Sequence, residues 1–146
     1  MLRNISLFAL VLLLLSCSNP KQQKTAGVDY EAVVRTTVSE FQRSLPQNIG
    51  NGITMKQMYL KNKDVVYEYE IDETENGMML ASYDEVRMKG DIVASMKNLP
   101  SDAQKSFREF LRAICETGRD LVYLYVGSSS HTEWRVVFSK EELEKI

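Results

Sequence analysis

Residues 65–72 read VVYEYEID, so that apolar and acidic side chains alternate over most of the stretch. A period of two is typical of a β-strand that packs one face on a core and turns the other toward water. The core face would carry Val65, Tyr67, Tyr69 and Ile71. Because the turn-forming residues 62–64 come just before it, we expect 53–61 and 65–72 to form a hairpin, with Lys56 or Lys61 opposite the acidic side chains.

A second hairpin is expected near the C-terminus. Residues 121–126 (LVYLYV) form an unbroken apolar run, which is typical of a central strand. The Gly- and Ser-rich segment 127–132 follows as a loop. Residues 134–138 then return as the partner strand, with one face formed by Trp134, Val136 and Phe138.

Helices are predicted before, between and after the hairpins. Residues 28–45 carry apolar side chains at helical spacing, with Asp29 as the cap and Pro46 as the stop. Capping boxes that begin at Ser82, Ser101 and Ser139 mark three further helix starts. These helices are expected to run to about residue 98, over 102–116 and over 140–145. On the first of these helices, the side chains expected to face inward are Tyr83, Val86, Val93 and Met96.

These elements predict an α+β fold in the order helix, hairpin, helices, hairpin, within a single domain at residues 28–146. The sheet is expected to be four-stranded and antiparallel, with the helices packed on one face. Residues 47–52, which include two glycines, are expected to form a loop. The composition is 44% apolar and 26% charged, which is ordinary for a folded chain of 146 residues.

The N-terminal segment has a different character. Residues 1–20 read MLRNISLFALVLLLLSCSNP, with Arg3 ahead of a short apolar core at residues 5–15. That core is far below the roughly 20 residues that span a bilayer, which favours a cleavable signal peptide. Its end, Leu14-Leu15-Ser16-Cys17, resembles the lipobox of bacterial lipoproteins, in which a small residue precedes a cysteine that accepts a lipid. A plain secretory signal and an uncleaved anchor are the alternatives.

The lipoprotein resemblance implies a signal peptide at residues 1–16 and a mature chain that starts at a lipidated Cys17. Two or three acyl chains such as palmitate, at about 0.8 kcal/mol per buried methylene, make a stable membrane anchor. Residues 17–27 are then a polar tether. An Asp directly after the lipidated cysteine would resemble an inner-membrane retention signal, but this position is Ser18. No acidic residue precedes Asp29. The resemblance therefore implies the periplasmic face of the outer membrane in a Gram-negative host.

Few residues suit catalysis or metal binding. The sole histidine is His131, so a nucleophile would have to pair with it, the candidates being Ser128, Ser129, Ser130 and Cys115. Cys115 follows Ile114 in a helical pattern and is expected to be buried rather than reactive. One histidine and one free cysteine do not make an ordinary zinc site. We therefore expect no catalytic residue, no metal and no cofactor.

Acidic residues form two further patterns. Asp72-x-Thr74-x-Asn76-Gly77 resembles the start of an EF-hand calcium loop, but its twelfth position is Tyr83 rather than Glu, which favours an ordinary turn. Glu68 and Glu70 share a strand face and could act as paired carboxylates, although exposed charges on a strand are usually solvated. The net charge of −2, or −3 without Arg3, offers no basic surface for nucleic acid.

Aromatic and apolar residues are the main hint of a binding surface. Most aromatics are expected in the core, namely Tyr59, Tyr67, Tyr69, Tyr83, Tyr123, Tyr125 and Trp134. The second sheet face would also carry apolar side chains, namely Val66, Val122, Leu124 and Val137. If the helices cover one face only, this surface is free for a protein partner or for a second copy of the chain. The N-terminal or the C-terminal helix could cover it instead.

The tether, the small size and the lack of catalytic clusters favour a non-enzymatic envelope lipoprotein that binds another envelope protein. Such a module could be an accessory subunit of an envelope complex, an inhibitor or immunity-type protein, or a pilotin-like helper. One alternative is a binder of a small or lipidic ligand, favoured by seven methionines and many aromatics. Another is a hydrolase that uses His131.

Overall fold

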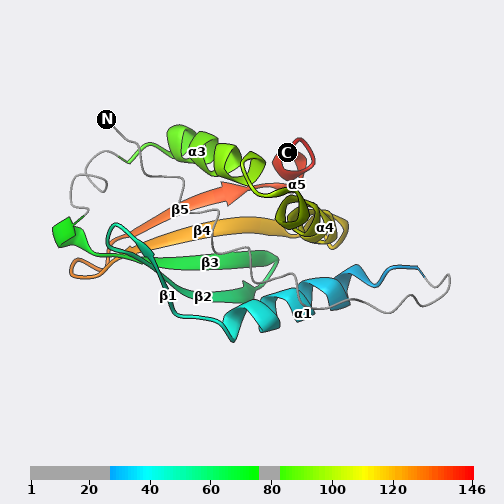
Figure 1. Cartoon of the computed structure of the whole chain (residues 1–146), viewed down its shortest axis with the longest axis horizontal. Coiled ribbons are helices and arrows are strands. Elements are labelled where there is room, and N and C mark those ends of the chain that lie inside the picture. Colours follow the sequence, from blue (N-terminus) through cyan, green and yellow to red (C-terminus); the bar gives the residue numbers. More distant parts are fainter. Residues whose placement is uncertain (1–26, 76–82) are drawn as a thin grey trace.

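The computed structural model describes residues 27–75 and 83–146 (Figure 1). Five strands form one sheet in the order β1-β2-β3-β4-β5, with the bounds β1 Gln47–Gly50, β2 Ile53–Lys61, β3 Asp64–Ile71, β4 Asp120–Gly127 and β5 Glu133–Phe138. The helices are α1 Tyr30–Gln42, α3 Glu85–Lys97, α4 Ser101–Glu116 and α5 Lys140–Leu143. The predicted signal peptide, Cys17 and the predicted tether as far as residue 26 lie outside the described residues.

Both predicted hairpins are confirmed. β2 and β3 pair antiparallel around a turn in which Asn62 takes a positive φ of 56°. β4 and β5 pair antiparallel over the whole of the predicted second hairpin. Lys56 Nζ lies 3.3 Å from Glu70 Oε1, so a lysine of β2 does sit beside the acidic side chains of β3.

The sheet as a whole differs from the prediction, because β3 and β4 are neighbours and run parallel. The purely antiparallel arrangement is therefore wrong. A parallel pair needs a long crossover, and α3 and α4 lie between the two strands in the chain. The Asp120 N–H donates to the Lys63 carbonyl at 3.0 Å, which places the start of β4 beside the start of β3.

β1 was not predicted, since residues 47–52 were expected to be a loop. It pairs antiparallel with β2, and its register shifts between Asn48 and Gly50. Gly50 and Asn51 take positive φ values of 91° and 52°, which turn the chain sharply into β2. A strand of four residues with one buried side chain, Ile49, is too short for alternation to reveal it.

The helix starts agree with the predictions in part. The Asp29 carboxylate accepts from the Ala32 N–H at 3.0 Å, as expected for α1, and Ser139 and Glu142 form the expected capping box at α5. The box at Ser101 is wrong, because Ser101 is already the first residue of α4 and no side chain caps that helix. α3 is capped by Asp84, and Ser82 lies outside the described residues.

The inward face of α3 also needs correction. Ile92 and Met96 are buried, whereas Val86 is 81% exposed. At 100° per residue Val86 lies about 120° around the helix from Ile92, so it cannot share the inward stripe. Tyr83 and Val93 are half-buried against the core as expected.

The helices α1, α3, α4 and α5 pack on one face of the sheet, as predicted. Their buried side chains belong to one cluster together with the sheet residues Tyr67, Tyr69, Tyr123 and Val136. Figure 1 shows α1 and α4 at the end of the sheet that holds the β2–β3 turn, and α3 alongside β5. The β4–β5 loop lies at the opposite end.

Candidate functional site

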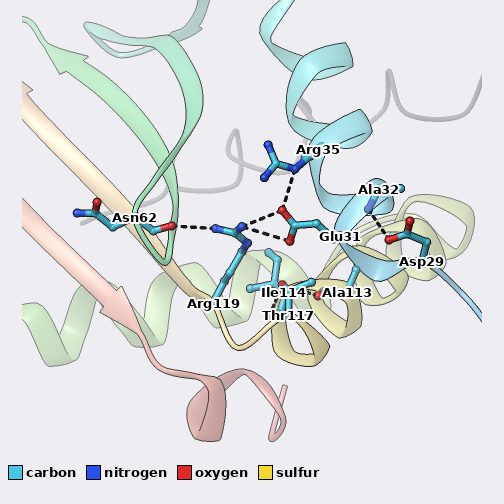
Figure 2. Close-up of polar contacts among 9 residues, drawn as sticks. All are labelled: Asp29, Glu31, Ala32, Arg35, Asn62, Ala113, Ile114, Thr117 and Arg119. Carbon is cyan, nitrogen blue, oxygen red and sulfur yellow. Dashed lines mark hydrogen bonds and ion pairs between the residues drawn. The ribbon is translucent and has the colours of Figure 1, made fainter.

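A partly buried arginine links three segments at one end of the sheet (Figure 2). Arg119 lies between α4 and β4, and 13% of its side chain is exposed. Its Nη2 donates to both carboxylate oxygens of Glu31 in α1, at 3.0 and 3.2 Å. Its Nη1 donates to the Asn62 carbonyl in the β2–β3 turn at 3.0 Å. Charged hydrogen bonds at these distances are strong, so Arg119 acts as a clamp between helix and sheet.

The Arg119 clamp is structural, and it lies where the chain enters the described fold. Glu31 is in the first turn of α1, four residues after Gly27, the first described residue. Arg35 Nε also contacts Glu31 at 2.8 Å, but 66% of its side chain is exposed. The clamp could not be predicted from the sequence, because Glu31 and Arg119 are 88 positions apart and no local pattern relates them.

A second polar cluster lies at the other end of the sheet. The Glu73 carboxylate accepts from the backbone N–H groups of Ser129 and Ser130, at 2.8 and 2.7 Å, and from the Ser130 hydroxyl at 2.5 Å. Successive backbone N–H groups of this kind form a nest for an anion. A Cβ at Gly127 would lie 2.6 Å from Glu73 Oε1, so a larger residue there would push the Glu73 side chain out of this position. The segment after β3 is therefore latched to the β4–β5 loop.

The Glu73 latch is expected to release in acid. Hydrogen bonds from Ser130 and Ser129 hold the pKa of Glu73 below its ordinary value of 4.5. A lowered pKa means that the latch stabilises the fold fully above 4.5 and loses this effect as the pH falls through the folded-state value. In an NMR pH titration, the amide shifts of Ser129 and Ser130 should move together with the Glu73 carboxyl.

The variant Glu73→Gln provides the control for this titration. Its amide cannot ionise, so the acid-dependent shift of the Ser129 and Ser130 amides should disappear. The Ser128 N–H, which donates to the Ile71 carbonyl at 2.9 Å, should shift little in either protein. An unchanged titration in Glu73→Gln would show that another group is responsible.

Two of the residues proposed for a hydrolase, Cys115 and His131, are not brought together. His131 is exposed in the β4–β5 loop, and Ser129 and Ser130 of that loop hold Glu73. Cys115 is near the end of α4, where its Sγ lies 4.0 Å from the Lys140 carbonyl. The length of β4 separates the two, because β4 runs between the ends of the sheet that carry them (Figure 1). A Cys115–His131 pair is therefore not formed.

Cys115 is buried, as expected. Only 8% of it is exposed, and it belongs to the core cluster together with Ile114. Burial raises the pKa of the Cys115 thiol, which disfavours the reactive thiolate.

The acidic residues singled out in the sequence are engaged by neighbours. Glu68 accepts from Gln57 Nε2 and from the Tyr59 hydroxyl, both at 3.0 Å, while Glu70 contacts Lys56. Asp72 accepts from the N–H and hydroxyl of Thr74, which lowers the pKa of Asp72 and makes a local turn. Residues 76–77 lie outside the described part. Within the described part, no group of acidic, histidine or cysteine side chains is placed to hold a metal.

A ladder of tyrosines fills the space between the sheet and the helices. Tyr67 and Tyr69 of β3 stack with Tyr123 and Tyr125 of β4, with ring centroids 5.2–6.2 Å apart. All four are buried, as expected, while Tyr59, Tyr83 and Trp134 are half-buried. Burial raises the pKa of Tyr67, Tyr69, Tyr123 and Tyr125, so all four stay neutral phenols.

Within residues 27–75 and 83–146, the buried Tyr125 hydroxyl has no hydrogen-bond partner. An unpaired buried hydroxyl costs about 1–3 kcal/mol of desolvation. Removing it in Tyr125→Phe is expected to raise the free energy of unfolding by about 1 kcal/mol, measured by urea denaturation. Tyr59→Phe is the matched control, because it deletes a hydroxyl that does bond, to Glu68, and should be neutral or slightly destabilising. Destabilisation by Tyr125→Phe would mean that its hydroxyl has a partner in solution.

The second sheet face carries a separate apolar cluster. Val66, Val122 and Leu124 are buried there, with Tyr59 and Val126 packed beside them, and Val137 of the same face is 36% exposed. The alternative in which the N-terminal or the C-terminal helix covers this face is wrong. The buried side chains of α1 and α5 belong to the cluster on the other face.

Comparisons with known proteins identify the fold alone. Neither a family model nor a curated protein sequence matches the chain.

None of the helices in the described ranges 27–75 and 83–146 has the length and apolar character needed to cross a membrane.

Two solved structures resemble this fold. One is a presumed secreted protein from Pseudomonas aeruginosa, 12% identical, with a TM-score of 0.57, covering 82% of this chain and 99% of its own. The other is the type II secretion system pilotin AspS from Vibrio cholerae, 13% identical, with a TM-score of 0.49, covering 77% of this chain and 91% of its own. The first likeness shows a shared α+β architecture, and the second is too low to support an argument.

Proposed function

We propose that the chain is the precursor of a bacterial envelope lipoprotein. Residues 1–16 are removed, Cys17 carries the lipid, and residues 17–27 tether a single domain at 28–146. The observation that carries the proposal is the sequence Leu14-Leu15-Ser16-Cys17 directly after a short apolar core. Ser18 and the absence of acid before Asp29 favour the periplasmic face of the outer membrane in a Gram-negative host.

The mature domain is proposed to act by binding another envelope protein rather than by catalysis. The candidate nucleophile Cys115 and the candidate base His131 lie apart, and the serines near His131 hold Glu73. The two polar clusters at the ends of the sheet join elements of the fold to one another. These arrangements support an accessory or inhibitory role, in which the surface recognises a protein partner.

The lipoprotein proposal predicts a complete loss of lipid attachment and of cleavage in Cys17→Ala. Without the thiol no lipid is attached, so the precursor should retain residues 1–16 and incorporate no labelled fatty acid. Intact mass and metabolic labelling with an alkynyl fatty acid measure both effects. Cys115→Ala is the matched control, since this buried cysteine should not affect labelling. Normal processing of Cys17→Ala would refute the proposal.

The interaction proposal is tested by crosslinking in cells. The tagged, lipidated protein is crosslinked in envelope membranes, purified and compared with a variant that is retained in the cytoplasm. One dominant envelope protein, absent from the mislocalised control, is expected. Recovery of no protein above that control would contradict the interaction role.

Binding of a small or lipidic ligand is a second candidate. The observation that favours it is the unpaired Tyr125 hydroxyl among four stacked tyrosines, which a ligand polar group could satisfy. Native mass spectrometry of the purified protein would reveal a retained ligand as added mass. A mass equal to that of the lipidated chain alone would count against this candidate.

A further inference from the structure

The backbone of β5 has hydrogen-bonding groups that point away from the sheet. The Gly127 N–H donates to the Thr132 carbonyl at 3.0 Å, so these two residues form a hydrogen-bonded pair at the end of the β4–β5 hairpin. Hydrogen-bonded pairs recur at every second position of an antiparallel ladder. The N–H and carbonyl groups of Glu133, Arg135 and Val137 therefore face the outer edge.

A side chain and a helix cover this edge in place of a strand. The Tyr83 hydroxyl donates to the outward Arg135 carbonyl at 2.9 Å, and the Tyr83 ring lies against Trp134 at a centroid distance of 6.3 Å. α3 begins two residues after Tyr83 and runs alongside β5 (Figure 1). Within residues 27–75 and 83–146, no hydrogen bond joins the outward groups of Glu133 or Val137 to another segment.

Few side chains of α3 are buried in the fold. Two of the thirteen residues of α3 are buried, and Val86 is 81% exposed. Gly90 lies in the middle of the helix, where an added Cβ would meet nothing within 4 Å. Packing therefore does not require glycine there, and glycine weakens a helix relative to alanine. Two polar contacts of Lys89 also hold α3: its ammonium makes an ion pair with Glu142 at 2.8 Å and lies 5.6 Å from the centre of the Phe138 ring.

The opposite edge of the sheet is less suited to pairing. β1 has four residues, its register shifts between Asn48 and Gly50, and Pro46 precedes it. Short, irregular edges next to proline are devices that block strand addition. β5 has six residues in unbroken register with β4, so it offers a regular ladder once α3 moves away.

We propose that the outer edge of β5 is a strand-addition site for an extended segment of a partner protein, and that α3 with Tyr83 is its displaceable cover. The inference rests on the proposed function, because it assumes a protein partner. An added strand makes backbone hydrogen bonds for affinity and uses alternate side chains for specificity.

The charges around β5 define the segment that fits. On the helix-covered face the added strand would take the place of Ile92 and Met96 beside Trp134, Val136 and Phe138, so apolar side chains are required at alternate positions. On the other face Arg135 is exposed, and its guanidinium lies 3.9 Å from Asp64, the outer limit of an ion pair. The partner segment is therefore an alternating strand with an acidic residue beside Arg135.

Hydrogen exchange tests whether α3 is displaceable. Amide exchange is measured by NMR on the mature, lipidated protein in detergent, for the wild type and for Gly90→Ala. The α3 amides are expected to exchange faster than those of α4 and β4, and Gly90→Ala should slow them about fivefold by strengthening the helix. Exchange of α3 at the same rate as α4 and β4 would show that the helix leaves only on global unfolding, and would overturn the proposal.

A peptide probe tests the edge itself. The probe is a nine-residue peptide of alternating valine and threonine with glutamate at its centre and lysine at both ends. It should shift the amide signals of Glu133, Arg135 and Val137, more strongly in Tyr83→Phe and more weakly in Gly90→Ala. The same peptide with a central proline should not bind, since proline cannot donate to a ladder. Shifts confined to other residues, or none, would overturn the proposal.

Crosslinking in cells separates this inference from the proposed function. A photo-crosslinking residue is placed at Val137 on the β5 edge or at Lys63 in the exposed β2–β3 turn. A partner captured from Val137 and not from Lys63 is expected, with a lower yield in Gly90→Ala. Equal capture from both sites would leave the interaction role standing and reject the β5 edge. Failure to recover any partner, by either method, would reject both.

Discussion

Replacing Tyr123 with alanine is expected to lower the free energy of unfolding by about 3–5 kcal/mol. Tyr123 is 7% exposed and lies at the centre of the tyrosine ladder. Its ring stacks on Tyr67 and Tyr69, at 5.3 and 6.2 Å, and meets Phe138 edge to face at 5.9 Å. Alanine would remove all three ring contacts and leave a cavity between the sheet and the helices.

The measurement is equilibrium unfolding in guanidinium chloride, followed by far-UV circular dichroism. Tyr123→Phe is the matched control: it keeps the ring and its contacts, so its loss should stay below about 1 kcal/mol. A loss below about 1 kcal/mol in Tyr123→Ala as well would show that the ladder is not packed in solution.

Replacing Arg119 with alanine is expected to cost about 2 kcal/mol. The change removes two hydrogen bonds to the Glu31 carboxylate and one to the Asn62 carbonyl, and with them the link between α1 and the sheet. The expected value lies below that for a fully buried pair, because Glu31 is 39% exposed and keeps part of its hydration.

Arg35→Ala is the control for the clamp, because Arg35 contacts the same carboxylate. With 66% of its side chain exposed, Arg35 should contribute no more than about 0.5 kcal/mol. Arg119→Lys should recover only part of the stability, since an ammonium cannot reach Glu31 and Asn62 with the two arms of a guanidinium. Equal losses in Arg119→Ala and Arg35→Ala would contradict a clamp at Arg119.

The hairpins and most helices could be predicted from the sequence because their signals are local. The alternation over residues 65–72 and the apolar run over 121–126 correspond to β3 and β4. Side-chain spacing of this kind depends only on the geometry of the element that carries it. The capping boxes were less reliable, since a serine before a helix is a cap only if the helix begins immediately after it, as at Ser139 but not at Ser101.

The order and direction of the strands depend on how the elements pack. Two hairpins can meet through either of their strands, and the sequence of each hairpin is compatible with both choices. The crossover through α3 and α4 brings Asp120 beside Asp64, which makes β3 and β4 parallel neighbours. The helices between the hairpins were a usable signal, because parallel neighbours need a crossover of this length.

The polar clusters at Arg119 and Glu73 could not be predicted because their partners lie far apart in the sequence. The Glu31–Arg119 and Glu73–Ser130 contacts join residues 88 and 57 positions apart. The composition allows many pairings of an acidic residue with a basic or polar one, and each of these contacts is only one of them. Only the folded chain selects among them.

The sequence by itself determined the individual strands of the two hairpins, the start of α1 and the burial of Cys115, because each follows from residues that are neighbours in the chain. It also predicts a lipid-anchor signal. The tertiary structure decided the parallel pairing of β3 with β4, the addition of β1, the clamp at Arg119 and the cover that α3 places along β5. Those features arise where residues distant in the chain compete for the same neighbours. Local propensity does not predict which of these residues come into contact. Burial and hydrogen bonding across the whole fold decide which contacts form.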